Sequence, residues 1–199
     1  WMIIFAVIAA IMVLIGLYHI RMLPSNQIPS TTKKTTSEVG RELVAVIANF
    51  FTKKHIFYYI CFIILYRLAE GFIMKIAPLF LRASREVGGL GLSLKEIGTL
   101  NGVFGSAAFV LGSLLAGIYV SKFGLKRTLF TLCCIFNLPF LAYTFLAVTQ
   151  PTNVYLIGTC ITMEYFGYGF GFVGLTLFMM QQIAPGKHQM SHYAFASGI

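Results

Sequence analysis

Four ionisable side chains lie inside long apolar stretches of this sequence, and these residues are the most capable of chemistry. Arg67, Glu70 and Lys75 share one stretch, and Glu164 lies in another. A charge left unpaired at the centre of a lipid bilayer costs about 2.5–3.5 kcal/mol, so each residue must face a protein interior or a wet cavity. Intramembrane carboxylates commonly relay protons. We therefore predict a substrate or proton pathway at these residues, with a purely structural tie between helices as the alternative.

The spacing of these charges predicts which of them can pair. Arg67 and Glu70 are one helical turn apart and can pair on one helix face. Lys75 lies further round the same helix and needs another partner, for which Glu164 is a candidate. Two aromatic residues that follow Glu164 are candidates to line the same cavity, with plain packing as the alternative: Tyr165 and Tyr168.

Long apolar segments must position these residues, and each is long enough to cross a membrane, which takes about 20 helical residues. The predicted spans are 1–20, 56–81, 97–120, 128–148 and 154–182, with a sixth beginning near Ser191. Pro78 and Pro139 fall inside spans and predict bends. Hydrophobic residues make up 58% of the chain and charged residues 11%, whereas soluble domains carry about 25% charged residues. The sequence therefore predicts an all-α membrane protein.

Residues 21–54 separate the first two spans. Their first part, 24–36, is rich in Ser, Thr, Pro and Lys and predicts a flexible connector. Apolar residues then recur at helical spacing and predict a short helix lying in the membrane interface. These residues are Val39, Leu43, Val46, Ile47 and Phe50.

Positive charge is shared unevenly between alternate loops. One side carries Arg21, Lys33, Lys34, Arg41, Lys53, Lys54, Lys122, Lys126, Arg127 and Lys187. The other side carries only Arg82, Arg85 and Lys95. The positive-inside rule places the first set in the cytoplasm.

Several function classes are disfavoured. The Lys and Arg residues form no compact patch, so we expect no nucleic-acid partner. The chain contains no Asp, so a Ser-His-Asp arrangement cannot be built, and we expect no enzyme activity. The four Cys residues lie in apolar segments without ligand spacing, so neither a disulfide framework, a metal site nor a cofactor is expected. We interpret His192, near the sixth span, as a hydrogen bonder at a helix end.

Two spans are rich in small residues. In the third span they form one stripe and predict close helix packing: Gly98, Gly102, Gly105, Gly112 and Ala116. Those of the fifth span follow Glu164, and we expect them to weaken or bend that helix: Gly167, Gly169, Gly171 and Gly174. A phosphate-binding loop is disfavoured because no strand precedes these glycines.

The turn between the third and fourth spans resembles the loop signature of the major facilitator superfamily of transporters, G-x-x-x-D-R/K-x-G-R/K-R/K. The matching stretch contains Gly117, Ser121, Lys122, Gly124, Lys126 and Arg127. Ser121 stands where the signature has Asp, which argues against the family's charge lock between helices, and Ser121 could instead cap a helix N-terminus.

This resemblance implies that the spans are helices six to ten of the superfamily, with helix eleven starting at Ser191. Residues 1–20 would end the N-terminal half, 21–54 would form the cytoplasmic linker, and 55–199 would form an incomplete C-terminal half. We expect an internal fragment of a larger protein, whose missing N-terminal half is a partner together with the lipid bilayer.

Residues 65–72 are more narrowly similar to the opening of helix seven in anhydromuropeptide permeases of the AmpG type. Residues 164–174 and 191–196 are similar to helices ten and eleven of those permeases. Eukaryotic acetyl-coenzyme A transporters belong to the same group of related transporters. The resemblance implies that Glu70 and Glu164 face each other across a substrate path, with Arg67 and Lys75 able to meet an anionic substrate.

The implied function is a secondary active transporter, a proton-coupled symporter that works by alternating access. Its implied solute is a muropeptide or a related cell-wall sugar-peptide, moved across a bacterial inner membrane. Two alternatives stay open: a facilitator for another anionic metabolite, such as an acyl-coenzyme A or an organic phosphate, and a membrane scaffold that transports nothing.

Overall fold

The computed structural model describes residues 2–22 and 35–199, and helices are the only regular structure in these two ranges. Trp1 and most of the predicted connector, including Lys33 and Lys34, lie outside the described residues. The chain divides into two units, Trp1–Arg41 and Glu42–Ile199, which we describe separately.

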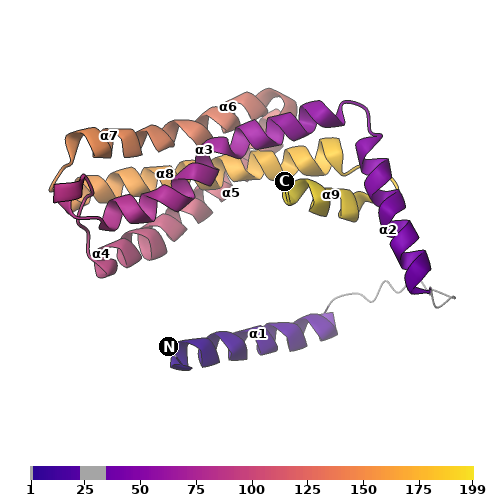
Figure 1. Ribbon diagram of the computed structural model, residues 1–199, viewed down its shortest axis with the longest axis horizontal. Helices are drawn as coiled ribbons and strands as arrows, with labels where there is room; N and C mark the ends of the chain where they lie inside the picture. The colour runs from indigo at the N-terminus through magenta and orange to yellow at the C-terminus, as the bar shows by residue number, and fades with distance from the viewer. Residues whose placement is uncertain (1, 23–34) are drawn as a thin grey trace. The chain divides into compact units, whose positions relative to one another are not determined.

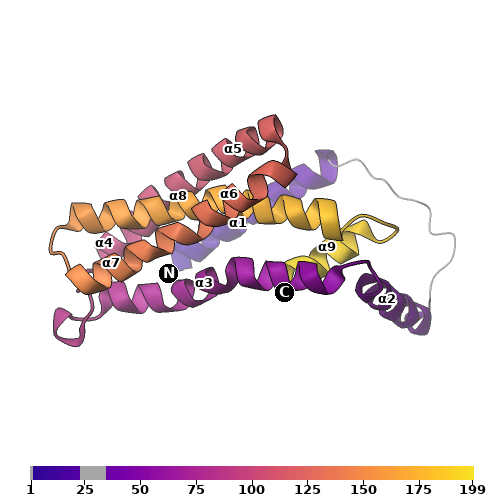
Figure 2. The same ribbon diagram turned by 90° about the horizontal axis from the view of Figure 1, so that it is seen from above.

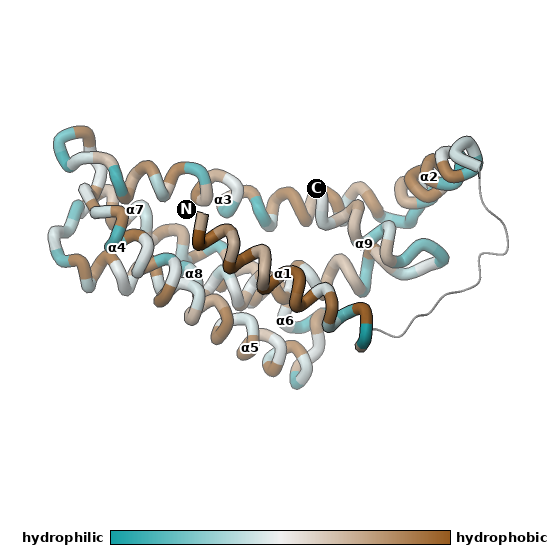
Figure 3. The backbone as a smooth tube through the Cα atoms, turned by 90° about the horizontal axis from the view of Figure 1, so that it is seen from below, coloured by the Kyte–Doolittle hydropathy of each residue, from teal (hydrophilic) through white to brown (hydrophobic). Residues whose placement is uncertain are grey.

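The first unit contains one apolar helix, α1 (Met2–Met22), and the beginning of α2 (Thr36–Phe51). Helix α1 has no acidic residue in its first turn, and its last turn carries His19 and Arg21. Its tube is mostly brown, the colour of apolar residues (Figure 3). A helix of 21 residues rises about 31 Å, at about 1.5 Å per residue, and therefore matches the hydrocarbon thickness of a bilayer.

The second unit is a helical bundle. It begins with the last turns of α2 and continues with α3 (Ile56–Arg82), the 3-10 turn η1 (Arg85–Val87), α4 (Leu94–Thr99), the π-helical segment η2 (Leu100–Gly105) and α5 (Ser106–Phe123). It then contains α6 (Leu125–Asn137), the 3-10 turn η3 (Leu138–Phe140), α7 (Leu141–Thr149), α8 (Val154–Phe178), the π-helical segment η4 (Met179–Ile183) and α9 (Gln189–Ser197).

Four helical stretches in the described ranges are long and apolar enough to cross a membrane, and they match the first four predicted spans. These are Met2–Met22, Ile56–Arg82, Leu94–Phe123 and Leu125–Thr149. The fifth predicted span is also helical, as α8 followed by η4, but Glu164 and several glycines and tyrosines make it less apolar. At Pro139 the α-helix is interrupted, because α6 ends at Asn137 and the 3-10 turn η3 carries the proline.

Helix α8 runs through the middle of the second unit in both ribbon views (Figures 1 and 2). It is continuous from Val154 to Phe178, so its glycines do not interrupt it. A Cβ atom at Gly169 would collide with the Phe109 backbone of α5, and one at Gly171 would collide with Phe136 of α6. These glycines therefore let two neighbouring helices approach α8 closely, and the expected weakening or bending of the helix stays a prediction.

The small-residue stripe of the third span behaves as predicted over only part of its length. Gly105 lies against the Tyr165 ring, and Gly112 lies against the Phe166 backbone. Gly98 and Gly102 have open space where a Cβ atom would be. Close packing therefore begins at Gly105, where the π-helical segment η2 ends and α5 begins.

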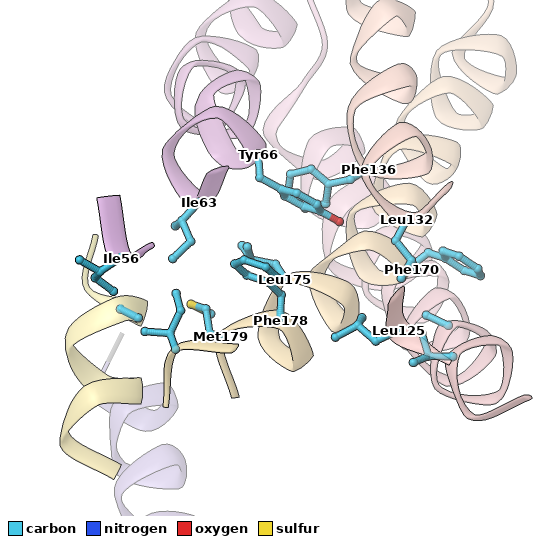
Figure 4. Packing of buried hydrophobic residues seen from close by; sticks show 14 of the residues in the cluster. Ile56, Ile63, Tyr66, Leu125, Leu132, Phe136, Phe170, Leu175, Phe178 and Met179 are labelled. Carbon is cyan, nitrogen blue, oxygen red and sulfur yellow. The ribbon is translucent and has the colours of Figure 1, made fainter. Parts of the chain in front are cut away.

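Two clusters of buried apolar side chains hold the second unit together. The larger cluster includes Tyr66, Phe136, Leu175 and Phe178, shown with other members in Figure 4. The smaller one comprises Leu81, Leu90, Leu92, Leu146, Ile157 and Ile161. Since α3 and α8 each contribute residues to both clusters, the middle part of each helix lies between the two.

Helices α3 and α8 run in opposite directions and are tied together at both ends. The Lys53 ammonium, just before α3, donates hydrogen bonds to the carbonyl oxygens of Ile183 and Pro185, just after α8 and η4. Partial burial lowers the pKa of Lys53. At the other end, the Arg85 guanidinium donates to the carbonyl oxygens of Gln150 and Pro151, each at 2.8 Å.

Candidate functional site

Two buried carboxylates lie between the two apolar clusters. Glu70 of α3 is 5% exposed and Glu164 of α8 is 3% exposed. On α3, Glu70 follows Tyr66 of the larger cluster and precedes Leu81 of the smaller one. On α8, Glu164 lies between members of the two clusters in the same way. Two carboxylates in an apolar surrounding need nearby partners, because an uncompensated buried charge is costly.

Glu70 has an ionic partner on its own helix. The Arg67 Nε atom donates to Glu70 Oε2 at 2.9 Å, which confirms the pairing predicted from their spacing. The Arg67 side chain is 38% exposed and that of Glu70 is 6% exposed, so the cation reaches solvent while the carboxylate stays inside. The Tyr168 hydroxyl of α8 also interacts with the Glu70 carboxylate.

Glu164 has a different kind of partner. The Tyr143 hydroxyl, on α7, interacts with its carboxylate. Lys75 does not fill this role: it lies on the exposed side of α3, so the suggested Lys75–Glu164 pair is not formed. Glu164 and Glu70 interact electrostatically. The structure thus brings the carboxylates of two different helices within each other's electrostatic field.

Arg67, Glu70 and Lys75 line one groove of about 540 Å³. Its wall comes mainly from α3, including Leu68 and Phe72, with a contribution from Gly198 and Ile199. Two cations and one carboxylate give the groove a net positive charge, which suits an anionic ligand. Glu164, Tyr165 and Tyr168 are not part of the groove wall.

Tyr168 and Tyr165 take different roles behind the groove. Tyr168 links the two parts of the site, because its hydroxyl contacts Glu70 and its side chain interacts with Arg67. Tyr165 is half-buried, packs with the smaller apolar cluster and interacts electrostatically with Glu164.

The signature stretch forms a tight turn between α5 and α6. Gly124 lies between the two helices with a φ of 78°, a left-handed conformation that favours glycine. Ser121 lies in the last turn of α5, so the suggestion that it caps a helix N-terminus is wrong. The basic side chains of the turn are exposed, and the Lys122 ammonium lies 5.4 Å from the centroid of the Phe123 ring. Gly117, one turn before Ser121, has open space around it.

His192 lies apart from these carboxylates, at the other end of the bundle. It is 1% exposed, and its Nε2 atom lies 3.2 Å from the carbonyl oxygen of Val46 in α2. Its ring also contacts Phe50, with centroids 5.7 Å apart. This agrees with its interpretation as a hydrogen-bonding residue at a helix end.

Sequence reasoning did not select three residues that support the site. Tyr143 gave no local signal, because its contact with Glu164 depends on how α7 packs against α8. Tyr66 and Asn137 lie beside the site: the Tyr66 hydroxyl donates to the Gly171 carbonyl oxygen at 2.8 Å, and the Asn137 amide donates to the Tyr66 carbonyl oxygen at 3.4 Å. The position of Tyr66, one turn before Glu70, could have indicated it.

Long apolar helices, a buried pair of carboxylates and a positively charged groove define a multi-pass integral membrane protein with a polar site inside its bundle. The family model of the Major Facilitator Superfamily matches residues 1–199. The chain belongs to the Major Facilitator Superfamily, which agrees with the resemblance seen in the signature turn.

Comparison with curated proteins gives related permeases. The anhydromuropeptide permease of Escherichia coli strain K12 is 25% identical over 143 residues, and so is that of Escherichia coli O157:H7. The match covers 72% of this chain and 28% of each permease. The chain therefore spans less than a third of the length of these relatives. No solved structure gave a significant match.

Proposed function

We propose that this chain is part of a secondary active transporter that moves an anionic solute across the membrane by alternating access. The observation that carries the proposal is the pair of buried carboxylates, Glu70 and Glu164, beside a groove with excess positive charge. Charged residues inside membrane spans are costly and commonly mark solute or ion pathways. Membership of the superfamily supports the same conclusion.

The proposed solute is a muropeptide or a related cell-wall sugar-peptide. Two relatives are named anhydromuropeptide permeases, and the carboxylates of a peptide stem would suit the Arg67 guanidinium and the Lys75 ammonium. The E. coli relatives also support a location in a bacterial inner membrane. The same positive groove suits the alternative solutes, an acyl-coenzyme A or an organic phosphate.

Protons are the proposed coupling ion, which would make the transporter a symporter. Protonation of Glu70 would remove its negative charge and weaken its ion pair with Arg67, leaving the guanidinium free to bind an anionic solute. Glu164 would act as a second proton acceptor behind the groove. Coupling then follows because the solute binds best after a carboxylate has been neutralised.

The proposed organisation follows the superfamily. Residues 1–20 end the N-terminal half, 21–54 form the cytoplasmic linker with α2 in the membrane interface, and 55–199 belong to the C-terminal half. An N-terminal half like that of the superfamily would supply the opposite wall of the solute path. The excess of Lys and Arg in alternate loops supports a cytoplasmic position for the linker and the signature turn.

Uptake of a radiolabelled anhydromuropeptide by the intact protein in proteoliposomes tests the proposal, with and without an inward proton gradient. We expect gradient-driven uptake, and we expect Glu70→Gln and Glu164→Gln each to lower it by about ten-fold or more, the scale of losing one positioned proton-transfer group. Glu86→Gln, an exposed carboxylate in η1, is the matched control and should transport normally.

Full gradient-driven uptake in both site variants would remove the proton role from Glu70 and Glu164. Uptake of an organic phosphate or an acyl-coenzyme A, with no uptake of the anhydromuropeptide, would favour the facilitator alternative. Absence of uptake for all three solutes would favour the scaffold.

A further inference from the structure

Tyr66 forms a buried hydrogen bond between the two helices that carry the carboxylates. Its hydroxyl donates to the carbonyl oxygen of Gly171 at 2.8 Å, and its side chain is 1% exposed. The Tyr66 ring packs against Phe136, with centroids 4.9 Å apart, and Figure 4 shows the two rings together with the phenol oxygen pointing away from α3. A buried phenol with a single acceptor is expected to fix geometry, because losing the acceptor would leave a polar group unsatisfied.

This bond lies close to the carboxylates along both helices. Since α3 and α8 are antiparallel and each residue rises about 1.5 Å, Glu70 lies about 6 Å above the bond along α3. By the same rise, Tyr168 lies about 4.5 Å above the bond along α8, and Glu164 lies about 10.5 Å above it. Glu70 and Tyr168 are therefore nearly level, which agrees with the contact between their side chains.

The hydrogen bonds of Lys53 and Arg85, at the two ends of α3, cannot by themselves set the position of α3 along α8. Lys53 precedes α3, and Arg85 follows it beyond Ala83 and Ser84, so each acts from a connecting segment rather than from the helix. Within the middle of α3, Tyr66 supplies a direct side-chain hydrogen bond to the backbone of α8. Asn137 of α6 adds a weaker contact, at 3.4 Å, to the carbonyl oxygen of Tyr66 itself.

We infer that Tyr66 is a positioning residue whose hydrogen bond to Gly171 sets the register of α3 against α8 and so holds Glu70 beside Tyr168. Its effect on solute uptake rests on the proposed function, whereas its effect on register does not. Tyr66 touches neither solute nor proton in this role. It acts through Glu70, one turn further along the same helix face.

Disulfide formation tests the register without any solute. In an intact protein from which all native Cys residues have been removed, Glu70→Cys is combined with Tyr168→Cys, and the rate of oxidative cross-linking is measured with Tyr66 and with Tyr66→Phe. Tyr66→Phe removes only the phenol oxygen and with it the hydrogen bond that sets the register of α3 against α8. We therefore expect the cross-link to form at least about five-fold more slowly, because a disulfide requires the two Cβ atoms at a specific distance. The α5–α8 pair Phe109→Cys and Phe172→Cys is the control and should cross-link equally in both backgrounds.

Uptake tests the consequence for the site. Tyr66→Phe should lower proton-driven uptake by about ten-fold, the scale of losing a buried hydrogen bond. The matched control is Tyr58→Phe, at an exposed tyrosine of the same helix, which should transport normally. In a Glu70→Gln background, Tyr66→Phe should cause less than about a two-fold further loss, because both changes act on one group. A 4-aminophenylalanine at position 66 restores a donor and should restore uptake.

Unchanged cross-linking in Tyr66→Phe would overturn the inference, and so would a loss of uptake that is fully additive with Glu70→Gln. A protein that transports normally with Glu70→Gln but cross-links slowly with Tyr66→Phe would overturn only the proposed function of Glu70. Detergent-solubilised Tyr66→Phe protein is checked for monodispersity, and the rescue by 4-aminophenylalanine separates a lost donor from misfolding.

Discussion

Glu70 and Glu164 are equally buried, yet the protein compensates them in different ways. Glu70 has a cation, Arg67, and a phenol, Tyr168. Glu164 has the Tyr143 phenol, and no Lys or Arg lies within ion-pair distance of it in residues 2–22 and 35–199. The first carboxylate therefore has an opposite charge beside it, whereas the second has a neutral phenol.

Removing only the Arg67 cation should show how much Glu70 depends on a charged partner. Arg67→Gln leaves the Glu70 carboxylate buried without a charge partner, and we expect the free energy of unfolding to fall by about 1–3 kcal/mol, less than for a fully buried pair because Arg67 reaches solvent. Arg67→Gln combined with Glu70→Gln should recover most of the loss. Thermal unfolding in detergent measures both; equal losses in the single and double variants would contradict the pairing.

Removing the Tyr143 hydroxyl tests the second carboxylate. Tyr143→Phe keeps the ring and removes the hydroxyl that interacts with Glu164, so we expect a loss of about 1–3 kcal/mol in unfolding free energy. Tyr155→Phe, at an 88% exposed tyrosine on α8, is the control. The measurement is again thermal unfolding, and identical stability of the two variants would argue that Tyr143 does not support Glu164.

Local contacts of the site were predictable from the sequence, whereas contacts between distant segments were not. The Arg67–Glu70 pair follows from the helical repeat alone. The partnership of Tyr143 with Glu164 requires α7 to lie against α8, and the exposed position of Lys75 requires knowing which face of α3 is covered. No pattern within a single segment carries that information.

At the scale of elements, the glycines of α8 determine how closely α5 and α6 can pack against it. The glycines that follow Glu164 were expected to weaken the helix, because glycine has low helix propensity. In the structure they also serve packing, with α5 contacting one side of α8 and α6 the other. Span positions were predictable because long apolar runs dominate them, whereas the π-helical segments η2 and η4 had no sequence signal.

Two glycine substitutions separate the effect of close helix packing from the effect of the low helix propensity of glycine. Gly169→Ala places a methyl group against the Phe109 backbone, and we expect a destabilisation of about 1–3 kcal/mol from overpacking. Gly98→Ala enters open space on α4 and should be neutral or stabilising by up to about 1 kcal/mol. The two variants are compared by thermal unfolding. A destabilised Gly98→Ala beside an unaffected Gly169→Ala would contradict the close approach of α5 and α8.

At the scale of the whole molecule, the order of spans and the alternation of charged loops imply one orientation in the membrane. The segment Leu125–Thr149 is long and apolar enough to cross a membrane once, so we expect its two ends to face opposite sides. Reporter fusions at Lys126 and at Asn153 should therefore report the cytoplasm and the opposite compartment, respectively. Both reporters on the same side would contradict the assignment of α6, η3 and α7 to a single span.

Whether the groove beside α3 is part of a solute path depends on the complete protein. The match covers 28% of the length of the related permeases, and under the proposed function a second wall of the solute path faces the groove beside α3. A groove that belongs to a solute path contains water, whereas a helix face that only packs or meets lipid does not.

Labelling of introduced cysteines by a membrane-impermeant thiol reagent distinguishes these two situations most directly. In the intact, cysteine-free protein in membranes, Leu68→Cys lies in the groove of α3, and Leu114→Cys lies on an exposed apolar side of α5. We predict rapid labelling at position 68, slowed by added anhydromuropeptide, and negligible labelling at position 114. Equal, negligible labelling at both positions would contradict a water-filled path beside Arg67 and Glu70.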